Sequence, residues 1–191
     1  MKNKRTLLIL TLVLVLVIGG ASALYVQLGR YQDPGHLAVQ ASPAPQQEQA
    51  PQELSMAPDI TVYDKDGNAV HLSDYLGKPV VMNFWASWCG PCKMEMPDFD
   101  EKYKELGEDV QFLMINMTDG SRETVESASA FIEEQGYSFP ILFDSESSAM
   151  ISYRAFSLPS TYFINAQGQA VAKATGAIDG DTLQLGIDMI L

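Results

Sequence analysis

Residues 80–97, VVMNFWASWCGPCKMEMP, join a continuous apolar run to the cysteine pair Cys89 and Cys92. The run at 80–85 has the length and composition of a strand that is buried on both faces. Pro91 lies where a helix would begin, a position at which proline is tolerated, and apolar residues at helical spacing continue to Leu106. The stretch therefore predicts a buried strand that leads into two cysteines at the start of a helix.

The spacing of the cysteines indicates a dithiol that cycles with a disulfide, and the chain has no other cysteine. A helix N-terminus favours thiolate over thiol, so we expect Cys89 to be the nucleophile and Cys92 to resolve the mixed disulfide. Half of a zinc site and a structural disulfide are the alternatives. Neither fits well, because the only histidines, His36 and His71, lie far apart in the sequence and structural disulfides usually close longer loops.

The N-terminal segment predicts export. Three basic residues before position 6 precede an uncharged, mostly apolar run at 6–29 that is long enough to span a bilayer. The basic flank should stay in the cytoplasm, which leaves the rest of the chain outside. The Ala-Ser-Ala sequence at 21–23 also resembles a cleavage site, so residues 1–29 are either a signal anchor or a signal peptide. We favour the single-pass anchor, because apolar residues at 24–26 prolong the run.

Composition separates a tether from one domain. Residues 30–57 are rich in Gln, Ala and Pro without apolar periodicity, which predicts a disordered tether, and residues 58–191 suffice for a single domain with its own core. The chain has 12 Lys and Arg against 24 Asp and Glu, a formal net charge of −12. This acidic excess argues against nucleic acid as a partner.

The domain alternates strand and helix patterns and therefore belongs to the α/β class with a mixed sheet. A hairpin is predicted around Asp66-Gly67, from strands at 60–63 and 69–72. Further strands are predicted at 80–85, 110–117, 141–143, 161–164 and 169–174, and helices at 93–106, 122–135, 146–153 and 181–191.

With the block NFWASWCGPCKMEMP at 83–97 and Leu-Pro-Ser-Thr at 158–161, the chain resembles the TlpA/ResA-like family of membrane-anchored extracytoplasmic thioredoxins with a CGPC active site. The resemblance covers residues 58–191. It implies a thioredoxin-like mixed central sheet flanked by helices, with an N-terminal hairpin and a helix-strand insertion at about 122–143.

The resemblance also implies roles for residues around the thiols. Glu95 matches an acid that lies near the thiols in similar proteins and tunes proton transfer. Asn83 stands where cytoplasmic thioredoxins have a proton-accepting aspartate, and since an amide cannot accept that proton, Glu95 is the better candidate. A cis peptide is implied between Leu158 and Pro159, which would face the sulfurs and align substrate. Trp88 would pack beside the sulfurs and shield them, and it is expected to bind substrate together with Leu158 and Pro159. No cofactor and no metal are implied.

As a function, the resemblance implies reduction of disulfides in exported proteins, in cytochrome c maturation or in support of methionine sulfoxide reductases. The partners would be those substrate proteins and a transmembrane electron donor of the CcdA/DsbD type. The protein would lie at a bacterial cell membrane with its catalytic domain extracytoplasmic, or be secreted after cleavage. The Gly-Pro dipeptide between the cysteines favours the reducing direction. A dithiol oxidase and a non-catalytic copper-binding module of related fold are the alternatives.

Overall fold

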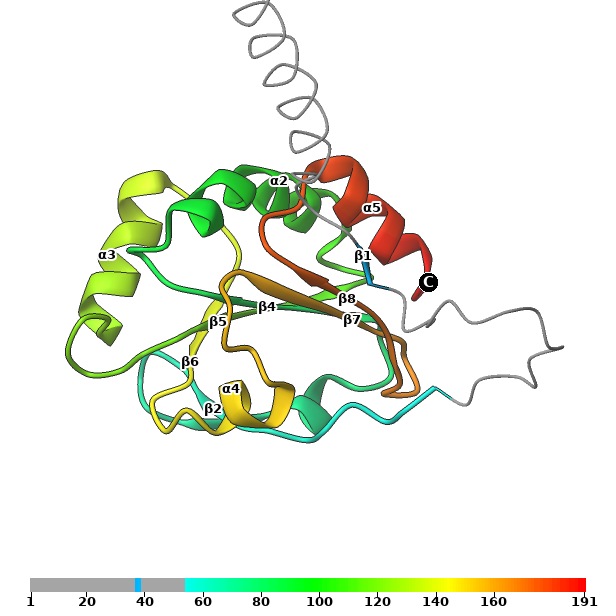
Figure 1. The fold of residues 1–191 in the computed structure, drawn as a ribbon, viewed down its shortest axis with the longest axis horizontal. Helices are drawn as coiled ribbons and strands as arrows, with labels where there is room; N and C mark the ends of the chain where they lie inside the picture. The colour runs from blue at the N-terminus through cyan, green and yellow to red at the C-terminus, as the bar shows by residue number, and fades with distance from the viewer. Residues whose placement is uncertain (1–36, 39–53) are drawn as a thin grey trace, which may run out of the picture. The chain divides into compact units, whose positions relative to one another are not determined.

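The computed structural model describes residues 37–38 and 54–191. In this part of the chain one mixed sheet has the strand order β1-β8-β7-β4-β5-β6-β2-β3 (Figure 1). Strand β4 pairs in parallel with β5, and β5 with β6, whereas the other neighbours are antiparallel. The strands are β1 (Leu37–Ala38), β2 (Thr61–Tyr63), β3 (Ala69–His71), β4 (Val80–Trp85), β5 (Gln111–Asn116), β6 (Ile141–Phe143), β7 (Ser160–Ile164) and β8 (Ala170–Thr175).

Helices cover both faces of the sheet, as Figure 1 shows. Helices α2, α3 and α5 lie on one face, and α4 with a short 3-10 helix, η1, on the other. Their bounds are α2 (Gly90–Leu106), α3 (Val125–Gln135), α4 (Ser148–Tyr153), α5 (Gly180–Asp188) and η1 (Leu72–Tyr75). The predicted α/β class with a mixed central sheet flanked by helices is therefore confirmed, as are the N-terminal hairpin β2–β3 and the insertion α3–β6.

Strand β4 is the centre of the core. All six of its residues are buried, as the uninterrupted apolar run predicts. Because successive side chains of a strand point to opposite faces, Val81 and Trp85 pack under α2, α3 and α5, whereas Met82 and Phe84 pack toward α4 and η1. The strand is thereby fixed on both sides, and the segment that leaves its carboxyl end, which carries the cysteines, starts from a rigid point.

The insertion helix begins later than the sequence predicts. We expect a helix from residue 122, but α3 starts at Val125, because Thr124 is its N-cap and exchanges capping hydrogen bonds with Ser127. Arg122 and Glu123 therefore lie in the loop between β5 and α3. The helix ends as expected at Gly136, which adopts a left-handed conformation with φ of 72°.

Pairing begins before Pro58, within the segment predicted to be a tether. Strand β1 pairs with β8, and Met56 forms an isolated bridge with Gln169. The rest of 30–57 and the predicted signal segment 1–29 lie outside the described residues. Within 37–38 and 54–191, none of the helices has both the length and the apolar character required to cross a membrane.

Candidate active site

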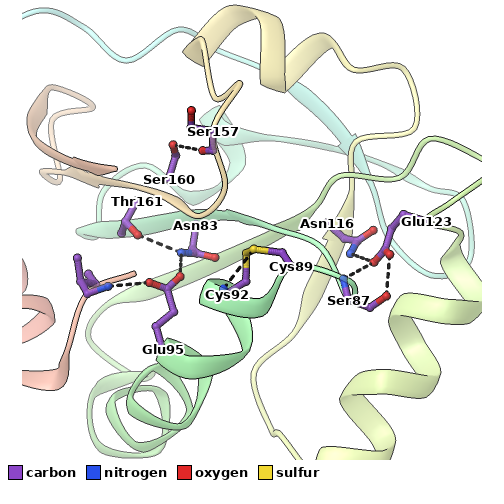
Figure 2. Close-up of a disulfide and its surroundings, with 11 residues drawn as sticks. Asn83, Ser87, Cys89, Cys92, Glu95, Asn116, Glu123, Ser157, Ser160 and Thr161 are labelled. Atoms are coloured by element: carbon purple, nitrogen blue, oxygen red, sulfur yellow. Dashed lines mark hydrogen bonds between the residues drawn. A yellow bond between two sulfur atoms is a disulfide. The ribbon is translucent and has the colours of Figure 1, made fainter. Parts of the chain in front are cut away.

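The two cysteines lie at the N-terminus of α2, where they form a disulfide (Figure 2). Cys89 is the N-cap of the helix, and its Sγ accepts a hydrogen bond of 3.2 Å from the Cys92 amide. The same amide and the positive end of the helix dipole would stabilise a Cys89 thiolate after reduction. The side chains differ in access, since Cys89 is 4% exposed and Cys92 is completely buried.

A cavity of about 620 Å³ opens beside Cys89. We call it the Cys89 cavity; Cys92 is not part of its lining. Two of the predicted substrate-binding residues, Trp88 and Leu158, line it. The other lining residues are Gly90, Pro91, Met117, Thr118, Asp119, Arg122, Ser147, Met150, Ala155 and Phe156. Much of this surface is apolar, and Trp88 and Phe156 are exposed, so a peptide could reach the sulfur of Cys89 over it.

The peptide between Leu158 and Pro159 is cis, as the resemblance implies. It immediately precedes β7, the neighbour of β4 in the sheet. Leu158 reaches the Cys89 cavity, whereas Pro159 is buried and does not line it. The structure thus places the carboxyl end of β4 and the start of β7 at one site.

Glu95 is buried rather than solvated, with 2% of its surface exposed. Its carboxylate accepts hydrogen bonds from Asn83 Nδ2 at 2.8 Å and from the amide of Ile178 at 3.0 Å, and Figure 2 shows the Glu95 and Asn83 side chains pointing toward each other. Burial disfavours the charged form and raises the pKa of Glu95 to about 7, although these two hydrogen bonds partly oppose the shift. Glu95 lies one helical turn after Cys92, so its buried carboxyl group is on the same side of α2 as the buried sulfur.

Comparison with known proteins decides the family. A model of the AhpC/TSA family matches residues 54–173, more than half of the chain. The chain belongs to the AhpC/TSA family.

Two curated relatives of the chain are named as thiol-disulfide oxidoreductases. The thiol-disulfide oxidoreductase ResA of Geobacillus kaustophilus (strain HTA426) is 34% identical over 139 residues, which cover 71% of this chain and 76% of that protein. ResA of Bacillus subtilis (strain 168) is 33% identical over 127 residues, covering 66% and 69%. Among solved structures, the exposed lipoprotein thioredoxin Etrx1 of Streptococcus pneumoniae strain TIGR4 is 33% identical with a TM-score of 0.57, covering 69% of this chain and 99% of that one.

These similarities show that the protein is a thiol-disulfide oxidoreductase with a thioredoxin-like fold. The structure supplies the pair of sulfurs at bonding distance that such an activity requires. Among residues 37–38 and 54–191, His, Cys, Asp and Glu side chains nowhere gather in a group of three that could hold a metal ion.

The sequence-based prediction misses two residues of the active site, Arg122 and Glu123. The Arg122 guanidinium lies 3.7 Å from the centre of the Trp88 ring, and Glu123 is completely buried against Ser87. The prediction places both in a helix. The capping pattern of Thr124 and Ser127 could have located the helix start after them, and hence both residues in the loop at the carboxyl end of β5.

Proposed function

We propose that this oxidoreductase reduces disulfides in exported proteins, with Cys89 as the attacking residue and Cys92 as the resolving residue. The observation that carries the assignment is the difference in access, because Cys89 lines the cavity and Cys92 is completely buried one turn later. Only Cys89 can meet a substrate disulfide first.

The reaction would proceed by two exchanges. The Cys89 thiolate attacks one sulfur of the substrate disulfide, forms a mixed disulfide and releases the other substrate sulfur as a thiolate. The Cys92 thiolate then attacks the Cys89 sulfur, which closes the Cys89–Cys92 disulfide and releases the second substrate thiolate. Two electrons pass from the dithiol to the substrate, and the enzyme is left in the oxidised form of this structure.

Glu95 suits the second exchange, in which the buried Cys92 must lose its proton. A general base works best when its pKa lies near the operating pH, and burial raises the pKa of Glu95 to about 7. The acid follows Cys92 by three residues on α2, so both lie on the same side of the helix. We therefore assign Glu95 as the base that accepts the proton of the Cys92 thiol.

The charges at the site favour a reductase over an oxidase. A strongly oxidising dithiol needs a strongly stabilised thiolate. The helix N-terminus supplies a favourable contribution of about 0.3–1 kcal/mol at an ordinary site. The Cys89 cavity adds one cation, Arg122, but also one anion, Asp119, whose pKa is lowered mainly by hydrogen bonds from the amides of Glu123 and Ser121 and to a smaller degree by Arg122. Because the charge of Arg122 is offset by Asp119, and Glu95 lies nearby, the surroundings add little electrostatic stabilisation to the Cys89 thiolate. A low reduction potential is therefore expected.

Regeneration requires a source of electrons outside the cytoplasm. The proposed donor is a transmembrane protein of the CcdA/DsbD type, and the proposed location is the outer side of a bacterial cell membrane, to which residues 1–29 would attach the domain. Support comes from the sequence of the segment, with basic residues before an apolar run. Apocytochromes c and exported methionine sulfoxide reductases are the substrates to examine first.

The assignment can be tested by trapping. Cys92→Ser should accumulate a mixed disulfide with an oxidised two-cysteine peptide, whereas Cys89→Ser should form none and have no turnover. Because the chain has only two cysteines, each variant has a single thiol and the position of the adduct is unambiguous by mass spectrometry. Full multiple turnover by Cys92→Ser would refute the two-cysteine mechanism.

The direction of electron flow is tested by the equilibrium between the Cys89/Cys92 couple and glutathione. A reductase should have a potential near that of thioredoxin, about −270 mV, whereas a strong oxidase would lie near −120 mV, the value of DsbA. A value near the second would redirect the proposal to disulfide formation.

A further inference from the structure

The turn that leads into Cys89 is held by a side chain from another part of the fold. Residues 86–89 form a tight turn, closed by a hydrogen bond of 3.1 Å from the Cys89 amide to the Ala86 carbonyl. Ser87 and Trp88 are the two central residues of this turn. Their positions therefore set where the Cys89 sulfur lies relative to the helix start and the cavity.

Glu123 fixes the first of these central residues at two points. Its Oε1 accepts the Ser87 amide at 2.7 Å, and its Oε2 accepts the Ser87 hydroxyl at 2.7 Å. Oε1 also accepts Asn116 Nδ2 at 2.6 Å, at the end of β5 (Figure 2). Both oxygens thus act as hydrogen-bond acceptors in a completely buried position.

The loop that carries Glu123 is itself braced. Asp119 Oδ1 accepts the amides of Ser121 and Arg122 at 2.7 Å and of Glu123 at 3.0 Å. The amides of Asp119 and Gly120 both donate to the Glu123 carbonyl at 3.0 Å. The carboxylate is therefore presented from a closed loop rather than from a free chain.

Arg122, the residue before Glu123, lies against the second central residue of the turn. Its guanidinium is 3.7 Å from the centre of the Trp88 ring. Two consecutive residues of the β5–α3 loop thus contact the two consecutive central residues of the active-site turn. One contact is a partly buried pair of hydrogen bonds to a buried carboxylate and the other is an exposed cation–π contact, so Glu123 contributes most of the restraint.

We propose that Glu123 is a positioning residue of the dithiol centre, which keeps the turn 86–89 in the conformation that presents Cys89 as the N-cap of α2. The inference rests on the proposed role of Cys89 as the attacking thiol. Its physical basis is the hydrogen bond from the Cys92 amide to Cys89 Sγ, whose geometry depends on where the turn places Cys89. Without the restraint, the reduced sulfur would lose this amide for part of the time, and the thiolate would be less stable.

The test compares two substitutions of Glu123 in the reduced protein. Glu123→Gln keeps an oxygen that can accept both N–H groups, and its Nε2 can donate to the Ser87 hydroxyl, so positioning should survive. Glu123→Ala removes every contact. Loss of an N-cap contact typically changes an equilibrium about fivefold, so Glu123→Ala should lower the rate of Cys89 alkylation by iodoacetamide about fivefold. Glu123→Gln should react at least as fast as wild type.

Ser87→Ala provides a second variant in case Glu123→Ala does not fold. It removes the hydroxyl contact and leaves the amide contact, so its alkylation rate should fall about two- to threefold, which is half of the fivefold effect on a logarithmic scale. Ser87 is only half-buried, so the methyl group should be accommodated without loss of the fold.

Asp100 offers a matched control on the same helix as the cysteines. Its Oδ1 accepts the amide of Ser138 at 2.7 Å and the hydroxyl of the same serine at 2.8 Å, the same pair of contacts that Glu123 makes with Ser87. It lies eleven residues after Cys89 in α2, about 16 Å along the axis. Asp100→Ala should lower the melting temperature and leave the alkylation rate unchanged.

Each rate is measured below the melting transition, with folding checked by circular dichroism. The inference is overturned if Glu123→Ala, or Ser87→Ala in its place, reacts like wild type, or if Glu123→Gln is as slow as Glu123→Ala. Alkylation needs no disulfide substrate, so a wild-type protein that fails to reduce disulfides would refute the proposed function without deciding the role of Glu123.

Discussion

Replacement of Glu95 by glutamine should remove a dependence of stability on pH. The pKa of Glu95 is raised from 4.5 to about 7 by burial. Since the native state then holds a proton that the unfolded chain releases, this group contributes stability fully only below pH 4.5, and the contribution is lost as the pH rises through 7.

The magnitude follows from the size of the shift. A pKa that is raised from 4.5 to about 7 lowers the free energy of unfolding by about 3 kcal/mol in total as the pH rises. About 2 kcal/mol of this loss falls between pH 5.5 and 8.5. The glutamine introduced by Glu95→Gln would mimic the protonated acid, so this position would no longer lower the free energy of unfolding as the pH rises. Its side-chain oxygen can accept a hydrogen bond from the Ile178 amide. Asn83 Nδ2 faces Glu95 in the wild-type protein, so the Asn83 amide must rotate by about 180° to bring its Oδ1, which has no hydrogen-bond partner within the described residues, into reach of the glutamine Nε2.

The assay is urea denaturation of the oxidised protein at pH 5.5, 7 and 8.5, for wild type and Glu95→Gln. Between pH 5.5 and 8.5 the free energy of unfolding of the variant should rise by about 2 kcal/mol relative to that of wild type. Carboxyl groups whose pKa is lowered, such as those of Asp119 and Asp179, titrate below this range and cancel in the difference. Glu105→Gln, at an exposed position of the same helix, is the control and should show no such change. A difference between Glu95→Gln and wild type that does not vary with pH would refute the reasoning.

Two further substitutions test the contacts around the site and the packing behind it. Arg122→Ala should change the fluorescence of the exposed Trp88, whereas the buried Trp85 should be unaffected. The substitution should lower the free energy of unfolding by less than about 1 kcal/mol. Unaltered emission would contradict the cation–π contact. Gly186→Ala should destabilise the protein by about 1–3 kcal/mol, because a Cβ there would fall on the buried ring of Phe163; a melting temperature equal to that of wild type would show that α5 can move away.

The order of strands and helices can be predicted from the sequence because each element has a local pattern. The apolar run of β4 marks a doubly buried strand, Asp66-Gly67 marks the hairpin, and Gly136 marks a helix end, and all three are confirmed. Boundaries are less certain, since the start of α3 depends on which residue caps it.

The active-site dithiol is likewise local, because four consecutive residues at a helix start suffice to bring the two sulfurs together. The sequence alone therefore determined the α/β class, the position of the disulfide and the residue at the helix N-terminus. It also placed Trp88 and Leu158 at the site through resemblance, and the structure finds both at the cavity beside Cys89.

Only the tertiary structure decided the state of the two carboxylates. Glu95 is buried because the Ile178 amide and the Asn83 side chain, 83 and 12 residues away, close over it, and Glu123 is buried because Ser87 meets it from 36 residues away. Nothing in the neighbouring sequence distinguishes these two acids from the exposed acids around them. Desolvation and hydrogen bonding depend on which distant segments pack together, so the packed fold, not local sequence, sets their chemistry.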